Sequence, residues 1–351
     1  MPLISDRTRV MRQAVIAAPD RLDLVETAVP ELRGDDEILV RTTASGICSG
    51  DLMTWYLEKK VGTVLGHEVV GRAVEVGADV EHIRPGDLVF IHHHAPCGHC
   101  PACAREEPVH CSQWRSSSLD PGGMAEWIRV PAVNVRGDSF AVNDLDSEQA
   151  VFIEPLGCSV KALQRVAPLV PLTGARAIVV GCGVMGLLNI AAARALGAVE
   201  VIAIEPDALR RRAALQHGAA RALTPEEASQ SLRRSADYVV VGPGHPDVIR
   251  QGLALVRDSG VLCLFTPTAT GISTALDLGD LYFREVSLVP SYSCGPADTR
   301  LAYELLRSGR VRTEGLVTHR YPLARVQEAF ATARAGGEAL KVLVTFEEAD
   351  S

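Results

Sequence analysis

Apolar and polar positions alternate in short runs through the first part of the chain, a pattern that predicts β-strands. Turn-forming residues such as Pro85 and Gly86 separate the runs. Strands are predicted at residues 13–18, 37–43, 69–76 and 88–92. This part is therefore expected to be rich in β-structure and loops.

After about Val160 the pattern changes to short apolar runs that alternate with longer segments of helical period. Strands are predicted at 177–180, 199–204, 238–241, 261–265 and 286–289, with helices at 186–196 and 208–217. Strands that alternate with helices imply right-handed crossovers and a parallel, doubly wound sheet. From about Pro296 two helices, 299–307 and 323–333, and two strands, 316–319 and 341–346, complete the chain.

The composition of the 351 residues narrows the class of protein. About half of the residues are apolar, which suffices for two domains with separate cores. The net charge is -8 and the basic residues are scattered, which argues against a nucleic-acid partner. No apolar run approaches the ~20 residues of a membrane span, and the first twelve residues lack the apolar core of a signal peptide. We therefore expect a cytoplasmic enzyme with no membrane partner.

Four of the nine cysteines, Cys97, Cys100, Cys103 and Cys111, have the spacing C-x2-C-x2-C-x7-C. In a cytoplasmic chain this spacing is typical of metal binding rather than of disulfides. Four thiolates complete the tetrahedral shell of zinc and exclude water, so the predicted zinc is structural. The alternative, four unlinked buried thiols, explains the spacing poorly. The neighbouring His99 and His110 are expected at the surface.

A second candidate metal site combines Cys48, His67 and Glu154. A thiolate, an imidazole and a carboxylate leave a fourth zinc position open, which is the catalytic type of site. Zinc in such a site acts as a Lewis acid on a bound alcohol. Each residue alone also fits a buried thiol, a hydrogen-bonded histidine or a surface carboxylate. The sequence GHEVVG at residues 66–71 favours the metal site.

Residues 181–186 have the sequence GCGVMG, follow a predicted strand and begin a predicted helix. This context is typical of a dinucleotide-binding loop, in which glycines let the backbone approach the pyrophosphate. The candidate cofactor-binding residues of the loop are Gly181, Gly183, Val184, Met185 and Gly186.

The acidic residue that follows the next predicted strand, Glu205, favours NAD. Its carboxylate is expected to accept hydrogen bonds from the ribose hydroxyls and to repel a 2′-phosphate. Arg210, Arg211 and Arg212 leave NADP open as an alternative, with Arg210 as the candidate near the ribose. A solvated helix face is the preferred interpretation for at least two of these arginines.

Taken together, these motifs resemble the zinc-containing medium-chain dehydrogenases over about residues 12–346. The sequences EPL at 154–156 and LVTH before YPL at 316–323 resemble the sorbitol and threonine dehydrogenase branch. The resemblance implies a GroES-like, β-rich catalytic domain, residues 1–159 with 296–351, and a Rossmann domain with a doubly wound parallel sheet, residues 160–295. It also implies a catalytic zinc at Cys48, His67 and Glu154, in the cleft between the domains. The resemblance leaves two roles for Glu68. Either Glu68 binds the zinc in some states, or Glu68 is the direct zinc ligand and Glu154 lies one shell further out.

The expected function is hydride transfer between a secondary alcohol and NAD, with two zinc ions per chain. The expected alcohol is a small polar molecule: a polyol, a sugar derivative, a cyclitol or an amino alcohol. One alternative is a zinc-inert reductase of the same superfamily that acts on an activated double bond or imine. Another is a non-catalytic NAD-binding structural or sensor protein. A homo-oligomer, either a dimer or a tetramer, is expected.

The sequence departs from the family where a hydroxyl usually relays the alcohol proton outward. Gly50 occupies that position, Ser49 lies one residue early, and Met53 replaces a histidine of many relatives. Ser49, water or a substrate hydroxyl are the alternatives, and water or the substrate is favoured.

Three further groups of basic residues have two interpretations each. A solvated loop is preferred over a phosphate contact for Lys59 and Lys60. Lys341 is interpreted either as a contact to the cofactor phosphates or as a solvated residue. For residues 92–94, three consecutive histidines, a role other than metal binding is favoured, with at most one facing the cleft.

Overall fold

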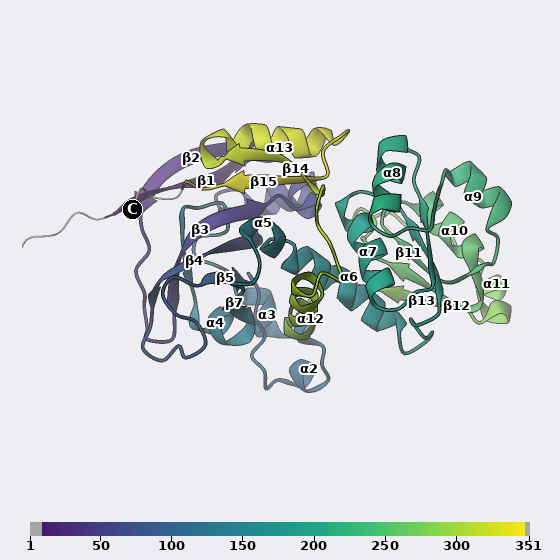
Figure 1. The fold of residues 1–351 in the computed structure, drawn as a ribbon, viewed down its shortest axis with the longest axis horizontal. Helices are drawn as coiled ribbons and strands as arrows, with labels where there is room; N and C mark the ends of the chain where they lie inside the picture. Colours follow the sequence, from purple (N-terminus) through teal and green to yellow (C-terminus); the bar gives the residue numbers. More distant parts are fainter. Residues whose placement is uncertain (1–8, 348–351) are drawn as a thin grey trace, which may run out of the picture. The chain divides into compact units, whose positions relative to one another are not determined.

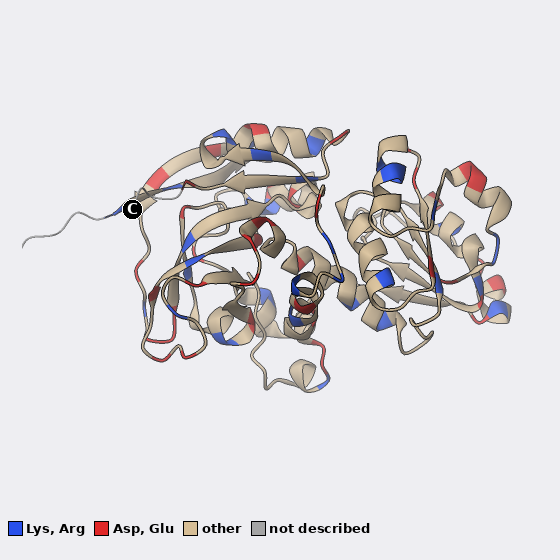
Figure 2. Cartoon of the chain, viewed as in Figure 1, with Lys and Arg blue, Asp and Glu red and all other residues tan. Residues whose placement is uncertain are grey.

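The computed structural model describes residues 9–347, which divide into two compact units. The first unit comprises Met1–Glu154 and Thr313–Ser351, and the second comprises Pro155–Arg312. The domain boundaries expected from the sequence remain a prediction. Acidic and basic residues are interspersed along the elements of both units (Figure 2).

The described part of the first unit has nine strands. They are β1 (Val10–Ala18), β2 (Arg21–Ala28), β3 (Ile38–Gly46), β4 (Glu68–Val76), β5 (Leu88–Ile91), β6 (Trp127–Val130), β7 (Ser139–Ala141), β14 (Val317–Pro322) and β15 (Lys341–Thr345). β1 and β2 form an antiparallel hairpin, of which only β1 was predicted. The other strands form one sheet in the order β14-β15-β3-β4-β5-β7, with β6 also paired to β3. The β-rich character predicted for this part of the chain is therefore confirmed.

Short helices occupy the loops of this unit. They are η1 (Ser49–Leu52), α1 (Thr54–Leu57), η2 (Glu58–Lys60), α2 (Pro101–Ala104), η3 (Pro108–His110), α3 (Ser112–Ser116), α4 (Ala132–Asp138), α5 (Ser147–Ala150), η4 (Leu323–Arg325) and α13 (Val326–Ala335). Helix α13 packs on β14 and β15 (Figure 1). Val326, Ala329 and Phe330 of α13 form a core with Leu57 of α1. This core fixes the loop between β3 and β4 to the sheet.

The second unit is a doubly wound domain built on a parallel sheet. Its strands are β8 (Arg176–Val180), β9 (Glu200–Ile204), β10 (Arg221–Leu223), β11 (Ala236–Val241), β12 (Val256–Leu264) and β13 (Ser287–Pro290). The order β10-β9-β8-β11-β12-β13 corresponds to 3-2-1-4-5-6 in chain order, the arrangement of dinucleotide-binding folds. All pairs are parallel, which confirms the alternation predicted from the sequence.

Helices flank both faces of this sheet (Figure 1). They are α7 (Val184–Ala195), α8 (Ala208–Gln216), α9 (Pro225–Ser231), α10 (Pro246–Leu255), α11 (Leu278–Arg284) and α12 (Pro296–Arg307), with α6 (Ile153–Val166) running from the end of the first unit into the second. The strand interiors are almost continuously apolar and buried, as expected for a sheet covered on both faces. No helix among residues 9–347 has the length and apolar character needed to cross a bilayer.

Candidate active site

The four clustered cysteines converge as their spacing predicts. Their sulfur atoms all lie within 4.8 Å of one another, and none forms a disulfide. The Sγ atoms of Cys100 and Cys103 are 3.6 Å apart. Val109 and Trp114 pack against the cluster and bury Cys111. Four free thiols that converge on one point match the ligand set of a structural zinc.

Backbone amides around this cluster favour the thiolate form of Cys111. Burial alone would raise its pKa, but hydrogen bonds from the amides of Cys97 and Trp114 lower the pKa to about 6. The Cys97 amide lies 3.4 Å from the Cys111 sulfur. Zinc binds the thiolate, so the fold prepares this ligand for metal. His99 and His110 are exposed, as expected.

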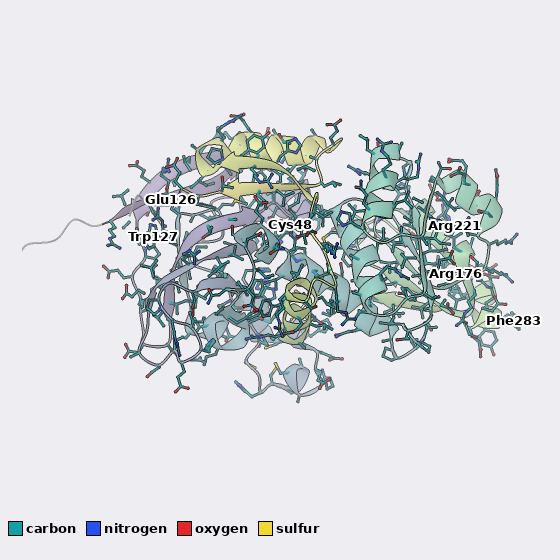
Figure 3. The ribbon with its side chains drawn as sticks, in the orientation of Figure 1. Cys48, Glu126, Trp127, Arg176, Arg221 and Phe283 are labelled. Atoms are coloured by element: carbon teal, nitrogen blue, oxygen red, sulfur yellow. The ribbon has the colours of Figure 1, made fainter. Side chains whose placement is uncertain are left out.

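A second group of possible metal ligands forms where β3 ends and β4 begins. One ligand atom each from Cys48, His67 and Glu68 lies within 4.8 Å of the other two. Gly46 pairs with Glu68 in the β3–β4 ladder, which brings the residues after β3 beside those before β4. A side chain at position 46 would meet the Glu68 carboxylate at 2.2 Å, so the glycine leaves room for it. Cys48, labelled in Figure 3, caps η1 and accepts the amide of Gly50 at 3.4 Å.

Glu68 forms a buried ion pair with Lys341 of β15. The Lys341 Nζ atom lies 2.5 Å from Glu68 Oε2 and 3.4 Å from the carbonyl oxygen of Ile47. Burial alone would lower the pKa of Lys341, but the negative charges of Glu68 and Cys48 raise it. Both interpretations of Lys341 from the sequence were therefore wrong, because the residue is buried and lies beside the candidate metal ligands.

Asp51 is the nearest carboxylate to the imidazole of His67. Its Oδ2 atom lies 3.4 Å from His67 Nδ1, and its side chain is fully buried. Burial would lower the pKa of His67, but Asp51 and Cys48 together raise it well above 6.5. A carboxylate in this position fixes the ring orientation of a metal-binding histidine.

Glu154 lies outside the group formed by Cys48, His67 and Glu68. It occupies the first turn of α6, and a carboxylate oxygen lies within 4.8 Å of a ring nitrogen of His92. Its charge still acts on His67 and Asp51. The choice between Glu68 and Glu154 as the direct ligand remains a prediction, and the grouping of Glu68 with Cys48 and His67 favours Glu68.

The three consecutive histidines have different environments. His92 Nδ1 lies 2.7 Å from Asp138 Oδ2, and His94 Nδ1 lies 2.8 Å from the carbonyl oxygen of Ser117. The ring of His93 lies 4.9 Å from that of His67, centroid to centroid. The expectation that at most one histidine of the tract faces the cleft remains a prediction.

The donor set around Cys48 fits zinc. Thiolate, imidazole and carboxylate are the three ligand types of catalytic zinc sites. Within residues 9–347, Glu68 Oε1 and both carboxylate oxygens of Asp51 are buried without a hydrogen bond, although Asp51 Oδ2 forms an ion pair with His67 Nδ1 at 3.4 Å. Buried acceptors of this kind are costly unless a cation or donor compensates them.

The glycine loop of the second unit has the geometry that a dinucleotide requires. Gly181 has φ +88°, and a side chain at Gly186 would lie 1.8 Å from the carbonyl oxygen of Gly181. No atom lies within 4 Å of the position that a side chain at Gly183 would occupy, so this part of the loop is open. Val184 and Met185 begin α7, whose N-terminal amides suit a pyrophosphate.

Glu205 is buried at the end of β9, beside this loop. Its carboxylate accepts the amide of Cys182 at 2.7 Å and the amide of Asp207 at 3.0 Å. The guanidinium group of Arg211 donates hydrogen bonds to the carbonyl oxygens of Glu205 and Pro206. These two hydrogen bonds fix the direction of the Arg211 side chain. Arg212 is exposed and Arg210 is half-buried, so the solvated-face interpretation holds for Arg212.

Three residues of the candidate site were absent from the predicted set: Lys341, Asp51 and His93. Asp51 is separated by only two residues from Cys48, and this proximity was the available signal. Lys341 is distant in sequence and is brought close by the pairing of β15 with β3. The sequence carried no signal for this contact.

Comparison with known proteins supplies two family matches. Residues 34–137 match the alcohol dehydrogenase GroES-like domain, and residues 184–308 match the zinc-binding dehydrogenase domain. L-threonine 3-dehydrogenase from Pyrococcus furiosus is 31% identical over 331 residues, which are 90% of this chain and 92% of the relative.

Two solved structures are similar in fold and in sequence. A zinc-binding dehydrogenase from Sinorhizobium meliloti bound to NADP has a TM-score of 0.85 and 25% identity, with 96% of this chain and 99% of that chain covered. Galactitol-1-phosphate dehydrogenase from Escherichia coli has a TM-score of 0.82 and 25% identity, covering 95% of this chain and all of that chain.

Proposed function

Because this chain belongs to the zinc-containing medium-chain dehydrogenases, in the sorbitol and threonine dehydrogenase-like branch, we propose that it oxidises a polar secondary alcohol at Cys48, His67 and Glu68. The chain is a zinc-dependent alcohol dehydrogenase that uses NAD(P). The assignment of the site rests on one observation: ligand atoms of a thiol, an imidazole and a carboxylate lie within 4.8 Å of one another.

The residues around the site have separate proposed roles. When bound there, zinc would supply Lewis-acid polarisation of the alcohol oxygen, and NAD would accept the hydride. Cys48 and His67 hold the metal, and Asp51 orients the His67 ring through Nδ1. Lys341 fixes the Glu68 carboxylate and neutralises its charge. Glu154 is proposed as a ligand only when Glu68 is not.

The four-cysteine cluster is the proposed site of a second zinc, which contributes to folding rather than to catalysis. The four ligands leave no position for substrate. Free thiols at both sites suit the cytoplasm, where thiols remain reduced, and we propose that compartment.

NAD is the proposed preference over NADP. The basis is the buried Glu205 carboxylate next to the glycine loop. A 2′-phosphate would bring a second negative charge toward this carboxylate. Gly181, Gly183, Val184, Met185 and Gly186 are the proposed loop contacts, and Arg210 is the proposed neighbour of the ribose.

The proposed substrate has more than one hydroxyl group, or a hydroxyl and an amine. L-threonine and galactitol 1-phosphate, named for two similar proteins, both fit this description. The buried carboxylates of Asp51 and Glu68 make the surroundings of the metal ligands polar.

We also propose that the chain forms a homo-oligomer, a dimer or a tetramer, through the edge of the six-stranded sheet. Among the strands of residues 9–347, β13 pairs only with β12 in that sheet. On the adjoining α11, three apolar side chains are largely exposed: Leu278 at 72%, Tyr282 at 76% and Phe283 at 86%. Exposed apolar groups next to a free strand edge favour association with a second copy. The mass in solution should be that of a dimer or a tetramer of the 37.5 kDa chain. The substitution Phe283→Asp should lower this mass.

The proposed function is tested with a panel of polyols, sugar phosphates, cyclitols and amino alcohols, followed by NADH formation. Zinc is measured per chain in the same preparation. The proposal predicts two zinc ions and highest kcat/KM among the polar secondary alcohols. A preference for simple long-chain primary alcohols would contradict the substrate assignment. One zinc per chain, held by the four cysteines, would contradict the catalytic site.

A further inference from the structure

Four aromatic rings of the first unit lie one against the next, between the candidate metal ligands and the four-cysteine cluster. The ring centroids of His67 and His93 are 4.9 Å apart, and those of His93 and His94 are 4.0 Å apart. The centroid of the His94 ring lies 4.1 Å from that of Trp114. We call these four rings the ring column. The column begins at a proposed metal ligand and ends at a side chain that packs with the cysteines.

Trp114 anchors the ring column in the segment that carries the four cysteines. Its side chain is buried and forms one apolar cluster with Val109 and the cysteines. Trp114 lies three residues after Cys111, and His94 lies three residues before Cys97. The two stacked rings are therefore carried by the two ends of the cysteine segment.

Ser117 fixes the contact between His94 and Trp114. Its hydroxyl accepts a hydrogen bond from the Ala95 amide at 2.8 Å and donates one to the carbonyl oxygen of Trp114 at 3.1 Å. His94 Nδ1 donates to the carbonyl oxygen of Ser117 at 2.8 Å. Because a carbonyl oxygen can only accept, this hydrogen bond fixes the tautomer and the orientation of the His94 ring.

His93 connects this fixed pair to the metal ligand. Its Nδ1 atom is buried and forms no hydrogen bond with any residue of the described chain, residues 9–347. Its ring centroid lies within 5.0 Å of those of three imidazoles: His67, His92 and His94. His92 is itself fixed, because its Nδ1 atom lies 2.7 Å from Asp138 Oδ2. The orientation of His93 therefore depends on packing between rings that are already held in place.

The His67 ring needs a second constraint besides Asp51. Asp51 Oδ2 lies 3.4 Å from His67 Nδ1, which is longer than an ordinary hydrogen bond of 2.7–3.2 Å. A carboxylate at this distance restricts the ring less than a hydrogen bond would. The stacked ring of His93 supplies the additional contact.

We propose that His93, His94 and Trp114 are positioning residues, which hold the His67 ring in the orientation that metal binding at Cys48, His67 and Glu68 requires. They act through His67. Residues that orient a metal-binding histidine typically change metal affinity about 10- to 100-fold. This inference rests on the proposed function, because it concerns a ligand of the proposed catalytic site.

The test measures binding of Co²⁺ to the Cys48 site in protein that retains one zinc per chain at the four cysteines. Co²⁺ is titrated against a competing chelator of known affinity, and the thiolate-to-cobalt absorption band reports ligand geometry. Trp114→Leu and His94→Ala should each raise the Kd for Co²⁺ about tenfold or more, which corresponds to ~1.4 kcal/mol. The band should also shift, because the imidazole no longer has a single orientation.

Two further variants separate positioning from general stability. Trp114→Phe keeps an aromatic ring and should hold the Kd within about threefold of the wild-type value. Val109→Ala is the matched control, because Val109 is buried in the same cluster as Trp114 but carries no ring. It should lower the unfolding temperature and change the Kd less than about twofold.

The role of His93 is tested without a change to the buried tryptophan. His93→Ala removes the ring and should raise the Kd for Co²⁺ about tenfold. His93→Phe keeps a ring of similar shape and should restore most of the affinity, because the proposed contact is packing rather than a hydrogen bond. Equal losses in His93→Ala and His93→Phe would show that His93 acts through a ring nitrogen, and would overturn the proposed role.

The remaining outcomes are also decisive. An unchanged Kd in His94→Ala and His93→Ala, or equal effects of Trp114→Leu and Val109→Ala on the Kd, would overturn this inference and leave the proposed function intact. Absence of the thiolate-to-cobalt band in the wild type would instead contradict the metal site on which the proposed function depends.

Discussion

Lys341 donates a hydrogen bond to Glu68, whose carboxylate lies within 4.8 Å of the ligand atoms of Cys48 and His67, and both side chains are buried in the first unit. The two residues are 273 positions apart in the chain. The antiparallel pairing of β15 with β3 places the lysine beside the carboxylate. A single ion pair thus connects the C-terminal strand to the candidate catalytic group.

Removal of the lysine alone should destabilise the protein strongly. In protein depleted of the catalytic zinc, Lys341→Met leaves Glu68 as an uncompensated buried charge, which typically costs about 3–5 kcal/mol. The double variant Lys341→Met, Glu68→Gln removes both charges and should recover most of the loss. Urea unfolding of the wild type, both single variants and the double variant measures the coupling. A loss below about 1 kcal/mol in Lys341→Met, the range of exposed pairs, would show that the pair is not buried in solution.

The sequence alone predicted those sites whose residues lie close together in the chain. The four-cysteine cluster and the glycine loop were predicted from residues that lie within fifteen positions of one another, and the family matches confirm the fold class and the enzyme class. The environment of Lys341 was not predictable, because a single lysine in an apolar strand gives no indication of which distant carboxylate lies across the sheet. Hairpin strand β2 was missed for a different reason, since half of its eight side chains are polar and none is buried.

Loss of the structural zinc should lower the stability of the protein rather than act directly on catalysis. Cys103→Ala removes one ligand of a closed shell, and structural zinc contributes directly to folding free energy. We expect zinc to fall from two ions per chain to one, together with lower solubility and a lower unfolding temperature. Cys263→Ala, a buried thiol of β12 outside the cluster, serves as the control and should retain both ions. Two ions per chain in Cys103→Ala would contradict the assignment of this site.

The cofactor preference should depend on Glu205. Glu205→Ser removes the negative charge that opposes a 2′-phosphate, so the preference for NAD should narrow or invert toward NADP. It also removes the acceptor of the Cys182 amide, so KM for NAD should rise. The exposed Arg212→Ala is the matched control and should leave the kcat/KM ratio of the two cofactors unchanged. A wild-type enzyme with the higher kcat/KM for NADP would refute the assignment.

Ser49 should contribute little to proton transfer. It is exposed on η1, one residue before the position that a relay hydroxyl usually occupies in the family. We expect Ser49→Ala to change kcat less than about threefold, well below the ~10² to 10⁴ of a positioned acid–base group. Gly50→Ser should retain activity, because the nearest atom to an added side chain is Cys48 Sγ at 3.6 Å.

The opposite outcome for Ser49 has a distinct signature. A loss of about a hundredfold or more in Ser49→Ala, with an altered pH–rate profile and intact zinc content, would identify Ser49 as the relay. Water and the substrate would then be excluded as the main route for the proton.

The detailed geometry of the metal ligands was only partly predictable. The sequence GHEVVG indicated both His67 and Glu68, but the choice between Glu68 and Glu154 depends on side-chain direction. Gly46, opposite Glu68 in the ladder, leaves the space that lets the carboxylate turn toward Cys48. This kind of packing between two strands does not appear in the sequence of either strand alone.

The catalytic zinc site is decided by the turnover of Cys48→Ala, measured together with its zinc content and unfolding temperature. We expect one zinc per chain, retained by the four cysteines, and a nearly unchanged unfolding temperature. We expect kcat to fall at least about a thousandfold, since the metal supplies several kcal/mol of transition-state stabilisation. A near-normal kcat in Cys48→Ala would contradict the catalytic zinc site and with it the proposed mechanism.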